Sequence, residues 1–378
     1  MRPVYVIAEN IVSPVALTAE ENFTSLQKGV TGIKLHKNTR ISAEPFYASL
    51  FDADTKFENT GNGYTKFEQL LILSINDAYK IAGISVTGQR TGLIISSTKG
   101  NISLIEDNEL TDDLRKRIAL YTSAQLIAKH FGFTTQPVVI SQACISGIVA
   151  LITGLRLLQS GCYDHIVVAG ADIISRFILS GFQSFHAVSN EPCKPFDVGR
   201  NGITLGEGAA TIVLSVHKPA SGEVIKLCGG SASNDANHIS GPSRTGAELY
   251  QAMKKAIAEA GIDEKKIDII SAHGTATLYN DEMESKAINL AGLQHVPVNS
   301  LKGFYGHTLG AAGLIESVIS ILSLKKNIML PTPGFNTAGT SLPVNVSNTI
   351  LEGEYQCCLK TASGFGGCNA AIVLQKAV

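Results

Sequence analysis

The stretch PVVISQACISG, residues 137–147, indicates the fold class and locates a reactive residue. Its apolar residues 137–140 predict a strand, and the amphipathic residues 145–160 predict a helix. Cys144 therefore lies in the tight turn between them, at the N-terminus of the helix. Unpaired backbone N–H groups and the positive end of the helix dipole favour a thiolate there. The turn predicts a nucleophilic cysteine, although a cysteine met alone is more often a small buried hydrophobic residue.

Two histidines follow predicted strands further along the chain. His273 lies in SAHGTAT, residues 271–277, after the apolar residues 267–270. His307 ends KGFYGH, residues 302–307, after a second extended segment at 296–300. Folds with alternating strands and helices gather catalytic side chains in such loops. A single histidine is commonly structural, but Cys144 with His273 and His307 predicts a catalytic constellation.

The chain also contains two similar halves. GEGAATIVL at residues 206–214 recurs as GGCNAAIVL at 366–374, shifted by 160 with five of nine positions identical. The same shift carries Cys144 to position 304, inside KGFYGH, so the cysteine turn and the histidine turn are predicted to be equivalent. Chance similarity of two glycine-plus-aliphatic strands is the alternative. The polar segment 217–223 predicts a junction between an N-terminal half, 1–217, and a C-terminal half, 223–378. Alternating strands and helices favour an α/β fold with buried sheets.

Composition excludes several classes of protein. With 378 residues, 44% hydrophobic residues and a net charge of −1, the chain can bury a large core and lacks the basic balance of a nucleic-acid binder. Its apolar stretches are too short to span a membrane, and we expect no signal peptide at the N-terminus. Seven scattered cysteines without metal-ligand spacing indicate reduced thiols and a cytoplasmic protein.

On these motifs, the chain resembles the beta-ketoacyl-[acyl-carrier-protein] synthases, which are Cys-His-His condensing enzymes of the thiolase superfamily. The resemblance covers nearly the whole chain. Its motifs are the cysteine turn, residues 194–197, 206–209, 273–275, 302–307, 310–313 and 364–367, with Asp281, Glu284 and Glu316. The resemblance implies a thiolase-like five-layered αβαβα fold made of two duplicated βαβαβ halves. It also implies a homodimer, with a heterodimer as the alternative.

The resemblance implies a decarboxylative Claisen condensation. Cys144 would take an acyl group from the phosphopantetheine arm of an acyl carrier protein. Malonyl-[acyl-carrier-protein] would lose carbon dioxide, and His273 and His307 would stabilise the enolate that attacks the acyl group, giving 3-oxoacyl-[acyl-carrier-protein]. The backbone N–H groups of Cys144 and Phe365 would form the oxyanion hole. No metal or redox cofactor is implied, and the pathway would be fatty-acid, polyene or polyketide-type synthesis.

The resemblance also implies supporting roles for several residues near the site. Lys302 matches an active-site lysine with an electrostatic role. Asp281 and Glu284 lie three apart on one predicted helix face and would orient Lys302 or the histidines, with a surface acidic pair as the alternative. Glu316 lies in an apolar stretch, so its burial predicts a hydrogen-bonded network near the site.

Other matches concern the substrate. Thr275 and Thr277 match threonines that bind the pantetheine arm, and Phe182 and Phe365 match an aromatic gate, although either phenylalanine could be core. Lys99 falls where relatives have an apolar residue facing the acyl pocket. Because a charged lysine in a pocket for a saturated chain would be costly, we expect a short, polar, unsaturated or aryl acyl group, or a lysine that turns outward.

A basic segment predicts where the acidic carrier protein docks. Arg115, Lys116 and Arg117 match the position of a docking segment in the family. A run of charges is otherwise usually a solvated face.

Three competing assignments stay open. A thiolase-type acyltransferase would use a second cysteine, and Cys368 lies in the late glycine-rich loop where that cysteine is expected. A Cys-His-Asn initiating synthase would carry asparagine where this chain has His307. A chain-length-factor-like partner subunit of a heterodimeric synthase typically lacks the nucleophile, whereas Cys144 is present.

Overall fold

Two five-stranded sheets form the centre of the structure, a computed structural model that describes residues 2–52, 54–55, 57, 60, 63–236 and 241–377. The first sheet has the order β1 (Tyr5–Val12), β8 (Gly208–Ser215), β6 (His165–Asp172), β4 (Thr91–Ser96) and β5 (Val138–Ile140). The second has the order β9 (Ile225–Asn234), β15 (Cys368–Lys376), β14 (Cys357–Gly364), β10 (Ile269–Ser271) and β11 (Val298–Asn299). The sheets join where β1 pairs with β9.

The two sheets have the same pairing pattern. In each, two antiparallel pairings are followed by two parallel ones. The Cys144 turn follows β5, and the segment with His307 follows β11, the equivalent strand. The predicted duplication of the fold is therefore confirmed. The boundary at residues 217–223, between β8 and β9, stays a prediction.

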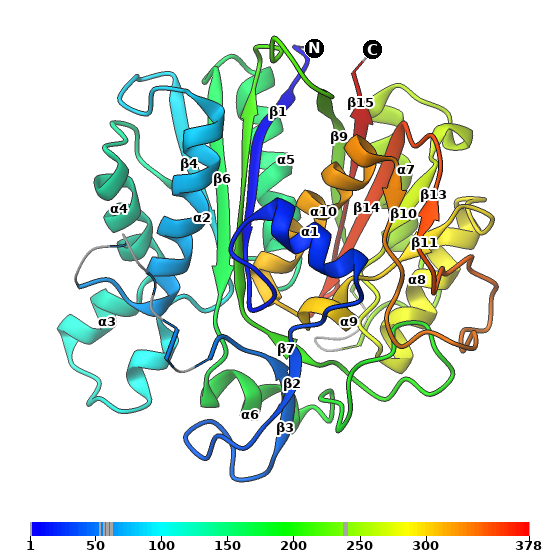
Figure 1. Cartoon of the computed structure of the whole chain (residues 1–378), viewed down its shortest axis with the longest axis horizontal. Helices are drawn as coiled ribbons and strands as arrows, with labels where there is room; N and C mark the ends of the chain where they lie inside the picture. Colours follow the sequence, from blue (N-terminus) through cyan, green and yellow to red (C-terminus); the bar gives the residue numbers. More distant parts are fainter. Residues whose placement is uncertain are drawn as a thin grey trace.

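The helices form three layers, one between the two sheets and one on the outer face of each sheet (Figure 1). Helices α5 (Ser146–Gln159) and α10 (Ala312–Lys326) lie between the two sheets. The outer face of the first sheet packs on α2 (Lys66–Ala82) and α4 (Leu120–Phe131), and that of the second on α7 (Ala247–Ala260) and α8 (Leu278–Leu290). Side chains of strand β4 alternate between two hydrophobic cores. Ile94 packs into the central layer, while Leu93 and Ile95 pack against the outer helices. The five-layered αβαβα architecture is confirmed.

Glycines let the two central helices meet at their N-terminal ends. A Cβ atom added at Gly147 would lie 2.9 Å from the Leu314 nitrogen, and one added at Gly313 would lie 3.0 Å from the Ile148 nitrogen. Real Cβ atoms rarely approach backbone so closely, so larger residues would force the helices apart. This close approach brings the turns before α5 and α10 together.

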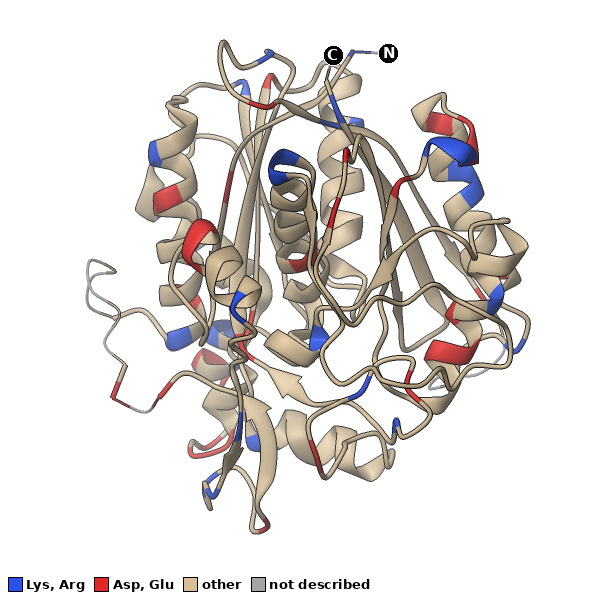
Figure 2. Cartoon of the chain, turned by 45° about the vertical axis from the view of Figure 1, so that its right-hand side comes forward, with Lys and Arg blue, Asp and Glu red and all other residues tan. Residues whose placement is uncertain are grey.

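The remaining elements lie around this core. They are α1 (Ala19–Gln27), α3 (Asp112–Ile118), α6 (Arg176–Ser184), α9 (Lys302–Tyr305), the small sheet of β2 (Ile33–His36), β3 (Phe46–Ser49) and β7 (Leu205–Gly206), and the pair β12 (Ile328–Met329) and β13 (Leu351–Glu352). Acidic and basic residues both occur on the outer helices (Figure 2), in line with the net charge of −1. Within the described ranges, no helix combines the length and apolar character needed to cross a bilayer.

Candidate active site

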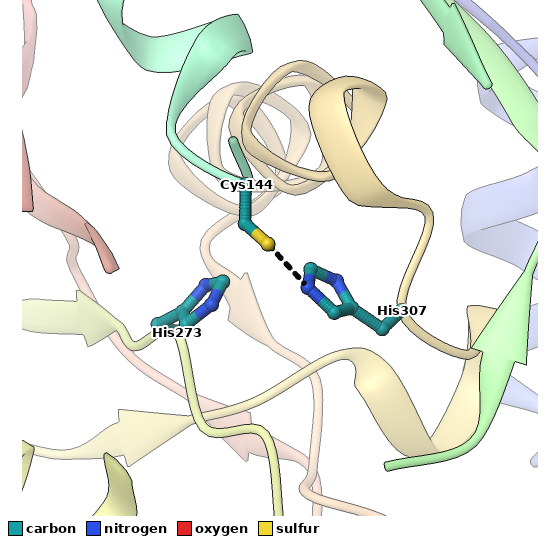
Figure 3. A group of neighbouring side chains, drawn as sticks. All are labelled: Cys144, His273 and His307. Carbon is teal, nitrogen blue, oxygen red and sulfur yellow. Dashed lines mark hydrogen bonds between the residues drawn. The ribbon is translucent and has the colours of Figure 1, made fainter. Parts of the chain in front are cut away.

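Cys144, His273 and His307 converge in the structure (Figure 3). The Sγ atom of Cys144 lies 3.0 Å from Nε2 of His307, and the two imidazole rings stand nearly perpendicular with centroids 5.2 Å apart. All three side chains are buried. The sequence therefore predicted correctly that these residues come together, although they lie up to 163 positions apart.

The turn after β5 is held in a strained but well-bonded conformation. Ala143, which precedes the nucleophile, has a positive φ of 45°, unusual for a residue with a Cβ atom. The hydroxyl of Ser146 accepts a hydrogen bond from the Gln142 N–H and donates one to the Ala143 carbonyl. These contacts fix Cys144 at the start of α5, as the sequence predicted.

The resting protonation state differs from the expected thiolate. Burial raises the pKa of Cys144 to about 12, with Cys368 and Asp172 adding to the effect, whereas the charges of Lys302 and Lys99 act in the opposite direction. Burial, followed by the charge of Lys302, holds the pKa of both His273 and His307 well below the usual value. The neutral thiol must therefore lose its proton on attack, and the neutral His307 ring lies within reach of that proton.

Two buried carboxylates fix the loop that carries His273. Glu284 accepts hydrogen bonds from the backbone N–H groups of His273 and Gly274 at 2.6 and 2.7 Å. Asp281 accepts one from the Thr275 N–H at 2.9 Å. Both carboxylates are fully buried on α8, so the alternative of a surface acidic pair is wrong. They hold the histidine loop, whereas Lys302 has a different carboxylate partner.

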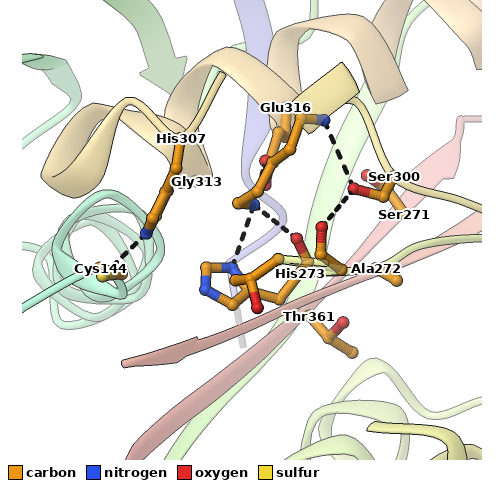
Figure 4. Close-up of polar contacts among 12 residues, drawn as sticks. Cys144, Ser271, Ala272, His273, Ser300, His307, Gly313, Glu316 and Thr361 are labelled. Carbon is orange, nitrogen blue, oxygen red and sulfur yellow. Dashed lines mark hydrogen bonds and ion pairs between the residues drawn. The ribbon is translucent and has the colours of Figure 1, made fainter. Parts of the chain in front are cut away.

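Lys302 fixes the tautomer of His273. Its ammonium donates to the His273 carbonyl at 2.5 Å and lies 3.3 Å from Nδ1 of the ring. Glu316 accepts from the same ammonium at 2.6 Å (Figure 4), which confirms the predicted network around that buried carboxylate. Because an ammonium only donates, Nδ1 accepts and Nε2 carries the proton. His273 thus presents an N–H donor on its far side.

Lys360 is a charged residue of this network that the sequence reasoning missed. It lies on β14 with no exposed surface, and its ammonium is 2.7 Å from the second carboxylate oxygen of Glu316. The available signal was a lysine in a strand without any other charged residue, because a buried cation requires partners.

Two cavities meet at Cys144. One, of about 390 Å³, is lined by His273, His307, Thr275 and Thr277. The other, of about 350 Å³, is lined mainly by apolar side chains and reaches Lys99. Three aromatic rings line both cavities, those of Phe182, Phe185 and Phe365. The ring of Phe365 lies 5.6 Å from each of the other two rings, measured between centroids, and Phe185 was not among the predicted gate residues.

Lys99 lines the second cavity but is exposed. Of the two alternatives, the exposure favours a lysine that turns outward, because water reaches the side chain. Its loop is fixed through the backbone, since the buried carboxylate of Asp172 accepts from the Thr98 N–H and from the Ser97 hydroxyl.

Arg117 forms an ion pair within the chain. Its guanidinium donates two hydrogen bonds of 2.6 Å to the carboxylate of Glu68, which is fully buried. The bidentate pair ties α3 to α2, so Arg117 has a structural role, and its place in the docking segment stays a prediction. Arg115 and Lys116 are exposed on α3, and their docking role stays a prediction.

The glycine-rich loop before β15 lies against the nucleophile. A Cβ atom added at Gly364 would lie 3.0 Å from both the Cys144 nitrogen and the Cys368 sulfur, which places the start of this loop beside the turn. The oxyanion hole formed by Cys144 and Phe365 stays a prediction. Burial raises the pKa of Cys368 to about 11, and its thiol donates to the Phe365 carbonyl at 3.3 Å.

The sulfur and the imidazole nitrogens of the three converging residues lie within 4.8 Å of one another, close enough to hold a metal ion. The ammonium groups of Lys302 and Lys360 oppose a divalent cation there by electrostatic repulsion. The arrangement therefore fits a nucleophile beside two hydrogen-bond donors better than a metal centre.

Comparison with known proteins gives concordant matches in both halves. Residues 1–220 match the family model "Beta-ketoacyl synthase, N-terminal domain", and residues 225–336 match "Beta-ketoacyl synthase, C-terminal domain". The "3-oxoacyl-[acyl-carrier-protein] synthase 2" of Staphylococcus aureus (strain COL) is 28% identical, over 97% of this chain and 96% of its own length. A Schizosaccharomyces pombe protein named as a mitochondrial 3-oxoacyl-[acyl-carrier-protein] synthase is 30% identical, over 82% of this chain and 81% of its own length.

A solved structure agrees with the fold. A beta-ketoacyl synthase from Burkholderia phymatum STM815 superposes with a TM-score of 0.91 and covers 100% of both chains at 22% sequence identity.

Proposed function

The chain belongs to the beta-ketoacyl synthase family, whose members are condensing enzymes, and we propose that it joins an acyl group held on Cys144 to malonyl-[acyl-carrier-protein]. The product would be 3-oxoacyl-[acyl-carrier-protein]. The observation that carries this proposal is the 3.0 Å contact between Cys144 Sγ and His307 Nε2 with His273 facing the same space.

The first half-reaction transfers the acyl group. The Cys144 sulfur attacks the thioester carbon, the bond to the pantetheine sulfur breaks, and the thiol proton passes through His307 Nε2 to the departing sulfur. The backbone N–H groups of Cys144 and Phe365 would stabilise the oxyanion. The cavity with Thr275 and Thr277 has the lining expected for the pantetheine arm.

The second half-reaction forms the carbon–carbon bond. Malonyl-[acyl-carrier-protein] loses carbon dioxide, and its thioester oxygen becomes an enolate. The Nε2–H of His273, fixed by Lys302, would stabilise that oxygen, together with His307 in the tautomer that carries its proton on Nε2. The enolate carbon then attacks the acyl thioester and releases the Cys144 sulfur. Since decarboxylation drives this step, we propose that the enzyme needs no cofactor.

Intact-mass measurement with a panel of acyl-carrier proteins tests the proposal. We expect the mass of the acyl group on the wild-type protein and no added mass on Cys144→Ala, a loss of at least about 1,000-fold in rate. No transfer from short, long or aromatic donors would instead favour a chain-length-factor-like partner subunit. A thiolase would accept an acyl group but release no carbon dioxide from the malonyl substrate.

We propose that the acyl group is short, polar, unsaturated or aryl. The second cavity is lined mainly by aromatic and aliphatic side chains, and Lys99 is the charged residue in its lining. We expect Lys99→Ile to gain turnover with long saturated acyl groups. If rates with these substrates are unchanged, Lys99 does not set the acyl class.

The remaining assignments concern partners and location. We propose an acyl carrier protein as partner, a homodimer as the assembly and the cytoplasm as the location. Strand β5 ends its sheet, and within the described part of the chain its outer edge has no strand partner, which would suit an interface between two copies.

A further inference from the structure

Lys360 is a buried cation that is held by several acceptors. Its ammonium donates to the Thr361 carbonyl at 2.6 Å and to the carbonyls of Ser271 and Ala272 at 3.2 Å each. It also pairs with Glu316 at 2.7 Å. Burying an ammonium costs several kcal/mol unless such contacts offset the loss of water. The acceptors therefore keep the charge in a fixed place.

The position of Lys360 links three parts of the site. Glu316 offers one carboxylate oxygen to Lys360 and the other to Lys302, which in turn binds the ring and the carbonyl of His273. Ser271 and Ala272 are the two residues before His273, so the same ammonium holds the backbone that leads into the histidine. The side chain of His273 is thus linked to Lys360 through Glu316 and Lys302, and the backbone before His273 is bound by Lys360 directly.

The charge also acts on the imidazole rings. Burial and the charge of Lys302 lower the pKa of His273 and His307, and Lys360 lowers both further. The titratable groups that face Lys360 are Glu316 on α10, Lys302 on α9, Glu284 on α8, Cys358 on β14, and His273 and His307. The two ammonium groups, of Lys302 and Lys360, repel a proton on either imidazole and so favour the neutral rings.

We infer that Lys360 is a positioning residue for the two histidines, because it shares Glu316 with Lys302 and anchors the carbonyl oxygens that lead into His273. The inference rests on the proposed function, in which neutral imidazoles stabilise an enolate. Lys360 contacts no reacting atom and acts through Glu316 and the loop.

The test compares Lys360→Met with Lys325→Met. Lys325 lies on the central helix α10 and pairs with the buried Glu9, so its substitution removes a partly buried ion pair away from the site. For Lys360→Met we expect kcat of condensation to fall about 10- to 100-fold with an unchanged KM for malonyl-[acyl-carrier-protein]. The acidic limb of its pH–rate profile should move to higher pH, because protonation of the histidines is no longer opposed by a second cation. Lys325→Met should show neither change.

Imidazole titration by NMR on the unloaded protein provides a readout that needs no activity. We expect His273 and His307 to protonate at higher pH in Lys360→Met than in the wild type. Lys360→Gln keeps N–H donors for the carbonyls and covers the case in which the methionine variant does not fold. Coinciding titrations in wild type and variant, or an equal effect of Lys325→Met, would overturn the inference. If the wild type transfers no acyl group, the proposed function has failed while the titration still decides the role of Lys360.

Discussion

The two halves place different segments at the same point of the fold. In the first half, five residues connect β5 to α5 and carry the single reactive residue Cys144. In the second, twelve residues connect β11 to α10, and they carry both Lys302 and His307. Lys302 reaches Glu316 and His273 on one side, while His307 reaches Cys144 on the other.

The difference shows how a duplicated scaffold acquires distinct roles. Close contact of α5 and α10 at Gly147 and Gly313 brings both connections together. The short connection leaves room for one nucleophile at a helix N-terminus. The longer connection carries a buried ammonium group and the imidazole that contacts Cys144.

The histidines should separate the two half-reactions, and this is the largest effect we expect. His307→Ala should slow acyl transfer to Cys144 and condensation, each by about 100- to 1,000-fold, because His307 contacts the sulfur. His273→Ala should slow condensation by a similar factor and leave acyl transfer nearly unchanged. Single-turnover mass measurement follows the first step and carbon dioxide release the second. Equal losses in both steps for both variants would remove the distinction between the two loops.

Adding a single methyl group should disturb the contact between the central helices α5 and α10. Gly313→Ala places a methyl group against Ile148 and should lower the free energy of unfolding by about 1–3 kcal/mol, measured by urea denaturation. Gly88→Ala is the control, because a Cβ atom there meets nothing within 4 Å. If both variants unfold at the same urea concentration, the contact between α5 and α10 does not require a glycine at position 313.

Asp281 should make stability depend on pH. Burial raises its carboxyl pKa to about 6, from 3.8 for the unperturbed group. The folded state then binds more protons than the unfolded state between about pH 4 and 6, so this group's contribution to stability is lost as pH rises through that window. We expect the free energy of unfolding of wild type, relative to Asp281→Asn, to decrease from pH 4 to 7. An identical pH dependence of the two proteins would contradict the raised pKa.

We expect the smallest effect from charge changes on helix α3, in the KM for the carrier protein. It lies between β4 and β5, whereas α8 alone connects β10 to β11, so α3 has no counterpart in the second half. Reversing the charges of Arg115 and Lys116 should raise KM for the carrier protein roughly 3- to 10-fold at low salt and reduce its salt dependence. Arg117 must be kept, because its pair with Glu68 holds α3 in place. A KM that does not respond would exclude α3 from docking.

Local sequence predicted the elements near the site closely. The predicted helix at 145–160 is α5, Ser146–Gln159, and the strand at 137–140 is β5, Val138–Ile140. Both follow from hydrophobic periodicity and turn residues, which depend on near neighbours. The residues of the Cys-His-His group were found because each lies in a distinctive loop directly after a strand.

The contacts that sequence reasoning missed join distant segments. Arg117 looks like part of a basic surface run until Glu68 is placed beside it. Cys144 looks like a thiolate because a helix N-terminus is visible in sequence, whereas its desolvation depends on atoms from the second half. Phe185 belongs to no motif, and only its neighbours identify it, whereas the partners of Lys360 come from other segments of the chain.

By itself, the sequence determined the alternating strands and helices, the duplication and the identities of the three converging residues, Cys144, His273 and His307, because these rest on periodicity and short motifs. Only the tertiary structure decided the protonation states, the sharing of Glu316 by two lysines and the exposure of Lys99. The physical reason is that burial and charge pairing depend on which distant segments exclude water from a group, and that is fixed only when the two sheets close on the central helices.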